Sequence, residues 1–246
     1  EKFFEVFGYY PEFSTSWMID SWSLQYLKAN YGVQVHQITR EQFGTDSYTL
    51  YGGWMQYPYW PAENWALIPD EQQRAGAQPL IVRQTIAYPV HNYGDRSNSY
   101  TSQPNDYLLR DDTLAYFQFL FNQAHAQPNA YTFALIGLEN SMEESAQVEY
   151  AKQLEYVSQW LAEDPQNQVI GVKTFADWLA QESPNVTVYT GDSEYLHRNE
   201  LAERPPEKAW WINTTRYRAR LRLSDKKLFL SDFRVYDPAF AGPYLD

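Results

Sequence analysis

The sequence of 246 residues contains no cysteine, which excludes disulfide bonds, thiolate metal sites and a cysteine nucleophile. It also lacks any run of about 18 apolar residues, so no segment is expected to span a membrane. Histidine is scarce, with four in the chain and no His-x-His or His-x-x-His spacing. A metal site built from this chain alone is therefore not expected, and no cofactor is evident.

Basic residues are also fewer than acidic ones. Lys and Arg total 19 against 31 Asp and Glu, which gives a formal net charge of −12. Because negative charge repels phosphate backbones, nucleic acid is not an expected partner. The most basic run, "RYRARLR" at 216–222, alternates with period two. We interpret it as a half-buried strand with Arg218, Arg220 and Arg222 on one face, rather than as a phosphate-binding patch.

Several enzyme motifs are missing as well. The sequence holds no Gly-x-Gly-x-x-Gly, no P-loop and no Gly-x-Ser-x-Gly. These absences argue against dinucleotide-binding, nucleotide-binding and serine-hydrolase functions.

Aromatic residues, in contrast, are abundant: 9 Trp, 21 Tyr and 13 Phe make up 17% of the chain. They crowd the loop "YGGWMQYPYWPAENW" (51–65), where Gly52 and Gly53 permit a tight turn. Two hypotheses stay open for this loop: a sugar-stacking site, or a packed aromatic core. Its candidate ligand-binding residues, with two more from "VHNY" after the next strand, are Trp54, Tyr57, Tyr59, Trp60, His91 and Tyr93.

Hydrophobic periodicity predicts strands and helices in alternation. Continuous apolar strands are expected at 33–38, 80–87, 132–138 and 168–172, and helices at 14–31, 111–126, 141–162 and 175–181. Such alternation is typical of parallel β/α units with both faces of the sheet covered. After residue 183 the pattern changes to period two, with a hairpin turn at "SDKK". We therefore predict a β/α domain at 1–183 and a β-rich C-terminal module at 184–246.

The helix expected at 141–162 follows a clear start signal. Ser141 and Glu144 fit a capping box, in which each side chain satisfies a free backbone amide. The apolar stripe predicted to face the core consists of Val148, Ala151, Leu154, Val157 and Leu161.

The order of features at 131–180 resembles a known family. A buried strand ends in a polar pair, a capped helix follows, and then come "QVIGVKT" and "FADWLAQ". This order resembles the last part of the polysaccharide deacetylase (NodB-like) barrel of the glycoside hydrolase/deacetylase superfamily. The helix, glycine and strand of "SLQYLKANYGVQVHQIT" are similar to an earlier unit of that barrel. The resemblance covers about residues 8–182. It implies an α/β fold with a (β/α) barrel that is partial or distorted, and a glycan ligand. It also implies an extracytoplasmic location, although a cytoplasmic location stays open.

Two departures from the family pattern affect the expected chemistry. Glu139 stands where the deacetylases have a histidine, and the Asp-Asp and His-x-x-x-His metal motifs of the barrel's first half are absent. The resemblance therefore implies that the chain lacks N-terminal units, which belong to a longer protein or to another chain; the alternative is a different α/β arrangement. A divalent metal is expected only if that missing part supplies the ligands.

Glu139 and Asn140 come directly after the strand predicted at 132–138. In β/α barrels such positions face the active-site mouth, where a carboxylate can serve as general acid or nucleophile. Asp46 and Asp106 are the candidates for the second carboxylate. The alternative is structural, since Glu139 can bond a neighbouring loop and Asp and Asn are common in turns and caps.

We therefore predict a carbohydrate-active protein that hydrolyses glycans with carboxylates at the C-terminal mouth of a β/α barrel. The alternative is a non-catalytic glycan-binding or structural protein with a degenerate barrel, and whether the chain is an enzyme stays open.

Overall fold

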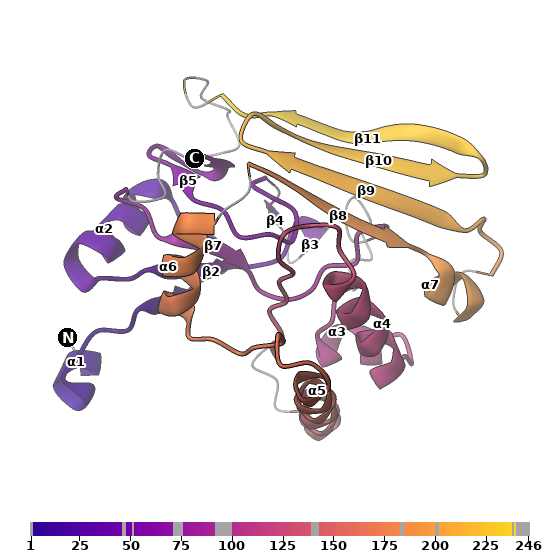
Figure 1. The fold of residues 1–246 in the computed structure, drawn as a ribbon, viewed down its shortest axis with the longest axis horizontal. Helices are drawn as coiled ribbons and strands as arrows, with labels where there is room; N and C mark the ends of the chain where they lie inside the picture. The colour runs from indigo at the N-terminus through magenta and orange to yellow at the C-terminus, as the bar shows by residue number, and fades with distance from the viewer. Residues whose placement is uncertain are drawn as a thin grey trace.

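The computed structural model describes residues 2–45, 48–50, 52–70, 76–91, 100–138, 143–182, 185–199, 202–237 and 239. The fold is α/β, as predicted (Figure 1). A parallel sheet lies near the N-terminus and an antiparallel sheet is formed by the C-terminal part of the chain. The helices are α1 (Lys2–Phe7), α2 (Ser21–Tyr31), α3 (Pro104–Leu108), α4 (Leu114–His125), α5 (Glu144–Glu163), α6 (Val172–Glu182) and α7 (Glu194–Asn199). Among the described residues no helix is long and apolar enough to cross a membrane.

The parallel sheet has three strands in the order β1-β2-β7. They are β1 (Phe13–Thr15), β2 (Val35–Ile38) and β7 (Leu80–Arg83), and both neighbouring pairs are parallel. Two of the predicted strands are thus confirmed, although β7 ends earlier than expected. Within the described part of the chain this sheet is open, so the predicted barrel is not seen there. Two small hairpins lie between β2 and β7: β3 (Gln42–Thr45) with β4 (Tyr48–Leu50), and β5 (Pro61–Ala62) with β6 (Trp65–Pro69).

Helix α2 begins later than the sequence pattern suggested. Asp20 is its N-cap and accepts a hydrogen bond from the Ser23 amide at 2.8 Å, and Gly32 ends it in the left-handed conformation at φ 73°. The first residues of the range predicted as helix, 14–16, belong instead to β1 and the residue after it. Ser14 and Ser16 hydrogen-bond the two ring nitrogens of buried His36 on β2, at 2.7 and 2.9 Å.

The segment 132–138 was predicted to be a buried strand, and this prediction is wrong: it forms no regular strand and is only half-buried. Its side chains nevertheless alternate as those of a strand would. Phe133 and Leu135 pack against a core cluster that contains Val35 and Leu80, whereas Ala134 and Ile136 pack against the larger cluster. The segment therefore separates two parts of the core without a backbone ladder.

The strand predicted at 168–172 is also absent. Residues 168–171 are irregular, and helix α6 already begins at Val172. Val169 and Ile170 are 78% and 40% exposed, so these apolar side chains are not part of the core. The helix predicted at 175–181 is confirmed within α6.

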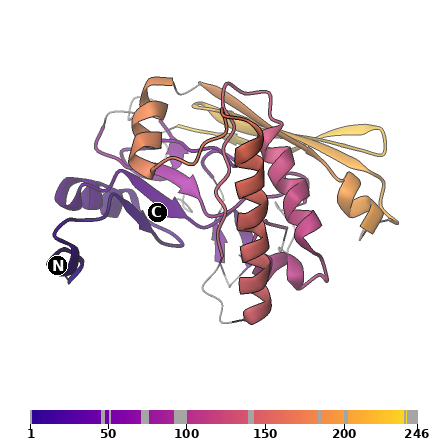
Figure 2. The ribbon, with the colours of Figure 1, turned by 60° about the horizontal axis from the view of Figure 1, so that its bottom comes forward.

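Helix α5 lies beside α4 (Figure 2), and its buried face differs from the predicted stripe. Ala146, Glu149 and Gln153 are its buried residues. Val148 and Leu154, both assigned to the core from the sequence, are 50% and 47% exposed. The reason is that Gln153 donates to the Ser102 carbonyl and to the Tyr107 hydroxyl, at 2.8 and 2.9 Å, which fixes a partly polar face inward.

The C-terminal sheet has the order β11-β10-β9-β8 and is antiparallel throughout. Its strands are β8 (Val186–Asp192), β9 (Glu207–Thr214), β10 (Tyr217–Ser224) and β11 (Lys227–Val235). The hairpin predicted at "SDKK" is confirmed, with Asp225 and Lys226 at positive φ, as a tight two-residue turn requires.

One face of this sheet packs on the rest of the molecule. Tyr189, Ala209 and Trp211 belong to the same hydrophobic cluster as Leu24 and Ile38. The core thus crosses the predicted boundary at 183/184, and the division into two domains stays a prediction.

The free edge of β8 is covered by side-chain amides. Gln127 bonds both the N–H and the carbonyl of Thr190, at 2.7 and 2.9 Å. Asn129 does the same for Val188, at 2.9 and 2.7 Å. These side-chain contacts satisfy backbone groups of β8 that a neighbouring strand would otherwise bond, so this edge is less open to pairing with another chain.

Candidate functional site

The carboxyl ends of β1, β2 and β7 meet at one edge of the parallel sheet. Ser16, Arg40 and Gln84 follow the three strands. The turns are tied together, since the Thr39 amide donates to the Trp17 carbonyl at 3.1 Å and the Gln84 amide to Ile38 at 2.9 Å. In parallel α/β folds ligands bind at this edge, so this edge is the candidate site.

Asp106, one of the predicted catalytic residues, lies at this edge. It sits in the first turn of α3, where Thr101 donates a hydrogen bond to its carboxylate. The Nε of Arg40, just after β2, is 3.9 Å from the same oxygen. The side chain of Asp106 is 14% exposed, and Gln84 and Gln103 hydrogen-bond each other at 3.3 Å. The structure thus brings one predicted carboxylate to the end of the sheet, paired with a cation.

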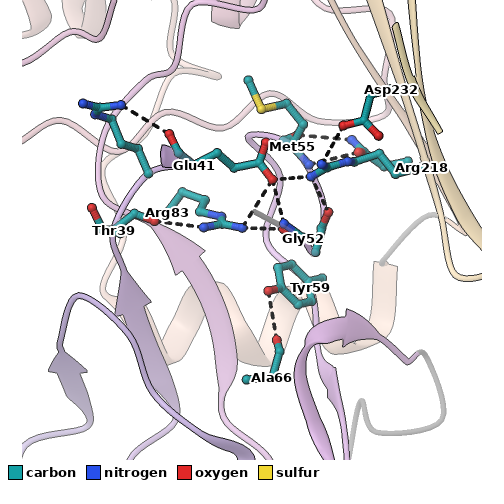
Figure 3. A network of polar contacts seen from close by, with 12 residues as sticks. Thr39, Glu41, Gly52, Met55, Tyr59, Ala66, Arg83, Arg218 and Asp232 are labelled. Atoms are coloured by element: carbon teal, nitrogen blue, oxygen red, sulfur yellow. Dashed lines mark hydrogen bonds and ion pairs between the residues drawn. The ribbon is translucent and has the colours of Figure 1, made fainter. Parts of the chain in front are cut away.

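A second polar cluster surrounds Glu41, three residues after β2 (Figure 3). One Glu41 oxygen accepts the Gly52 amide at 2.8 Å and is paired with Arg218; it lies 3.8 Å from Arg83. Arg218 also pairs with Asp232 at 2.8 Å. Two cations thus face two carboxylates, so the cluster carries no net charge.

Every charged group of this cluster is removed from water. Arg218 is completely buried, and the exposed fractions of Glu41 and Arg83 are 2% and 4%. Burial alone would lower the pKa of Arg218, but the Glu41 carboxylate, with Tyr236 and Asp232, raises it above the ordinary arginine value. Arg83 donates to the Thr39 carbonyl at 3.0 Å and also to the Gly52 carbonyl. The cluster therefore connects the end of the parallel sheet to the C-terminal sheet.

Two buried tyrosines lie beside the cluster, and each donates a hydrogen bond to a backbone carbonyl. Tyr59 donates to the Ala66 carbonyl at 3.0 Å, and Tyr236 to the Gly53 carbonyl at 2.7 Å. Burial raises the pKa of Tyr59 to about 12, so its hydroxyl stays protonated near neutral pH. In this arrangement the tyrosines act as hydrogen-bond donors rather than as acids or bases.

The aromatic loop lies inside the molecule. Trp54, Tyr57, Tyr59 and Trp60 are at most 4% exposed, and the Trp54 indole donates to the Thr214 carbonyl at 2.8 Å. These positions fit the packed aromatic core that the sequence left open. Sugar stacking by these rings stays a prediction, and none of the four presents a ring face to solvent.

The turn expected at the two glycines is confirmed. Gly52 and Gly53 have φ of 149° and 64°, both positive. A Cβ on Gly53 would lie 2.3 Å from the Tyr59 ring, so only glycine allows this close approach.

The other predicted site residues fall into two groups. His91 is 9% exposed and lies between the rings of Tyr88 and Tyr100, with centroids 5.5 and 5.6 Å away. Asp46, Tyr93, Glu139 and Asn140 lie outside the described residues, as does Ser141 of the expected capping box. Within the described ranges, no group of three or more His, Cys, Asp or Glu residues could hold a metal ion.

Sequence reasoning missed Arg40, Glu41 and Arg83. Arg40 and Glu41 follow the strand predicted at 33–38, which is the same criterion that singled out Glu139. Arg83 lies inside the strand predicted at 80–87 and is at a carboxyl end only because β7 is shorter than predicted. Arg218 and Asp232 were harder to find, because their pairing depends on how the C-terminal sheet docks onto the body of the protein.

Comparison with known proteins gives one informative result. No protein-family model matches the chain, and no curated protein matches it. Among solved structures, the chain is similar to the crystal structure of "a putative glycoside hydrolase/deacetylase" from Parabacteroides distasonis, with a TM-score of 0.64 and 13% sequence identity. The two share a fold. The likeness covers 97% of this chain and 59% of that chain, so this chain spans about three fifths of the length of the glycoside hydrolase/deacetylase-like neighbour.

Proposed function

We propose that this protein is carbohydrate-active and hydrolyses a glycan with carboxylates at the carboxyl ends of its parallel strands. The observation that carries the proposal is the fold likeness, over 97% of the chain, to a protein described as a glycoside hydrolase/deacetylase. The position of Asp106 beside Arg40 supports it, because ligands of parallel α/β folds bind at this edge of the sheet.

In the proposed reaction two carboxyl groups share the work. One protonates the leaving oxygen, and the other attacks the sugar or activates a water molecule. Asp106 is the described candidate and acts in the ionised form that pairs with Arg40. Glu139 or Asp46 is the proposed second carboxyl group, with Asn140 and Tyr93 contacting the glycan.

The proposal also includes a barrel-like arrangement of the strands. A barrel-like arrangement would place the segment 132–138 beside the parallel sheet, and its alternating packing supports this placement. The missing strands would come from an N-terminal segment or from another chain. A divalent metal would enter the mechanism only with ligands from that same source, and we propose an extracytoplasmic location on the basis of the glycan substrate.

A non-catalytic glycan-binding or assembly role is the second candidate. The burial of Trp54, Tyr57, Tyr59 and Trp60 favours the assembly part of this alternative, because rings inside a core stabilise the protein and do not stack on a sugar. In this alternative the polar edge of the sheet binds a glycan or a partner chain without cleaving it.

The two candidates differ in a direct experiment. The variants Asp106→Asn and Glu139→Gln are assayed for release of reducing ends from a panel of polysaccharides, and for binding of the same polysaccharides by calorimetry. Loss of a general acid or nucleophile is expected to lower turnover by about 100-fold or more while binding persists. Asp177→Asn is the matched control, because Asp177 is exposed on α6 and pairs with neighbouring Lys173.

Full turnover in both carboxylate variants would overturn the catalytic proposal. Binding without cleavage by the unaltered protein would favour the non-catalytic role. Neither binding nor cleavage of any glycan would reject both.

A further inference from the structure

The C-terminal sheet has an outer face, defined here as the side chains of β8–β11 that point away from the parallel sheet and the helices. Backbone alternation sets which residues belong to it. Arg218 reaches inward to Glu41, and Trp211 donates inward to the Pro89 carbonyl at 2.8 Å. The residues between such inward positions, including Leu221 and Ile212, therefore point outward.

This outer face is apolar across neighbouring strands. On β10 and β11 the directly opposed pairs are Tyr217 with Val235, Leu221 with Leu230, and Leu223 with Leu228. Trp210 and Ile212 of β9 continue the same rows. Such rows are typical of a sheet that packs against another layer.

Nevertheless, the outer face is open to solvent. Leu228, Leu230, Phe233 and Val235 are 62%, 59%, 58% and 65% exposed. Among the described residues, the parallel sheet and the helices lie on one side of this sheet in Figure 1. Exposed apolar patches of this kind on soluble proteins mark interaction sites.

Charge is segregated to the opposite face. Arg218, Arg220 and Arg222 alternate along β10 on the inner side, and Arg234 opposes Arg218 on β11. On the outer face, charged residues directly oppose each other only in the end row, where Asp192 faces Lys208. The centre of the outer face therefore offers apolar area and no charge.

We propose that this face binds a second copy of the chain, so that two sheets pack face to face about a two-fold axis. Strands of about eight residues and four strands at about 4.8 Å spacing give a planar footprint of roughly 500 Å² per copy. Two copies together bury roughly 1,000 Å² or more, the size that a specific interface needs. Two-fold pairing uses the same patch on both copies, and aligned packing of two such sheets is a stable β-sandwich.

The charge distribution favours a second copy over an unrelated partner. A foreign protein would be selected through charged groups that complement its own, and the centre of this face has none. Two copies carry −12 each and repel at a distance, so salt should strengthen the dimer by screening that repulsion.

The test measures mass in solution by light scattering and sedimentation velocity of the full chain. The unaltered protein is expected at twice 28.9 kDa, with a dissociation constant that falls as NaCl is raised. Leu230→Glu and Phe233→Glu place a charge on the face and are expected to be monomers with unchanged circular dichroism. Val169→Glu adds the same charge at a side chain that is 78% exposed and lies in the segment before α6, outside the C-terminal sheet, and it should remain a dimer.

A second measurement locates the contact. Since the chain has no cysteine, Leu221→Cys creates a single thiol in the middle of the face, and a short bis-maleimide should join two copies through it. Val169→Cys should not be joined. A monomer at about 100 μM, where even a micromolar dimer would form, would overturn the proposal, and so would a dimer that persists in both glutamate variants.

Discussion

Arg218 is a fully buried cation whose charge cannot be removed at accessible pH. It sits between Glu41 and Asp232, which lie on opposite sides of the junction between the parallel sheet and the C-terminal sheet. Taking such charges out of water is costly, and the cost is offset only while each charge keeps its partner. Replacing one of the three charged residues is therefore expected to lower the stability of the fold much more than replacing all three by apolar residues.

The variant Arg218→Met is expected to lower the free energy of unfolding by about 3–5 kcal/mol, because it leaves buried Glu41 and Asp232 without their shared cation. Guanidinium unfolding followed by circular dichroism measures the change. Arg222→Met on the same strand is the control, since the Arg222 side chain is 35% exposed and pairs with Glu207 at 3.3 Å; it should cost about 1 kcal/mol or less. Equal costs for the two variants would contradict this account.

His36 makes the stability of the fold depend on pH. Burial lowers its pKa from the ordinary 6.5 to about 4, so between these values the unfolded chain binds a proton that the folded protein does not. The stability it supports is complete above pH 6.5 and is lost as the pH falls toward 4, by about 3 kcal/mol in total.

Urea unfolding of the wild-type protein and of His36→Gln at pH 7 and pH 4 measures this contribution. Glutamine can still bond Ser14 and Ser16 but does not titrate, and the carboxylates affect both proteins alike. The wild type should therefore lose about 3 kcal/mol more than the variant on acidification. The same loss in both proteins would show that His36 is not the titrating group.

At this scale the sequence predicts local features better than long-range pairs. Gly52 and Gly53 were assigned to a tight turn from the local sequence alone, and the structure confirms that turn. Glu41 and Arg218 are 177 positions apart, and only the docking of two sheets brings them together.

At the scale of elements, helix positions were predicted well and helix faces poorly. Helix α5 has two faces with apolar residues, and the sequence suggested that Val148 and Leu154 are in the core. The structure instead buries Glu149 and Gln153, because hydrogen-bond partners on the neighbouring segment outweigh the difference in hydrophobicity. Periodicity cannot reveal such partners.

The variant Gln153→Ala is therefore expected to cost about 2 kcal/mol of stability, since it removes the buried hydrogen bonds that Gln153 donates to the Ser102 carbonyl and to the Tyr107 hydroxyl. Val148→Gln, on the exposed side of the same helix, should change stability by about 0.5 kcal/mol or less. Thermal and urea denaturation of both variants provide the comparison. The reverse order of costs would mean that the stripe read from the sequence is the buried one.

At the scale of the whole molecule, the two sheets share one hydrophobic cluster, which runs from Leu24 and Ile38 to Ala209 and Trp211. Periodicity predicted a parallel and an antiparallel sheet, because it depends on local pattern, but β1 was not predicted and two of the four expected parallel strands are absent. How the sheets meet depends on buried contacts, such as the bond from Trp54 to Thr214, that join residues far apart in the sequence. For this reason the sequence alone could not decide whether the aromatic loop is a packed core or a sugar-stacking site.

Asn129 acquires a particular importance from the irregular segment that follows it. Phe133, Ala134, Leu135 and Ile136 are all apolar, so sliding this segment by one residue would keep apolar side chains on both of its faces, and the difference in their sizes is what opposes it. A ladder of backbone bonds would normally forbid such sliding. Here Asn129 bonds Val188 and the Tyr57 hydroxyl through its amide, and Gln127 bonds Thr190 in the same way. These two side chains anchor the chain to β8 just before the irregular segment.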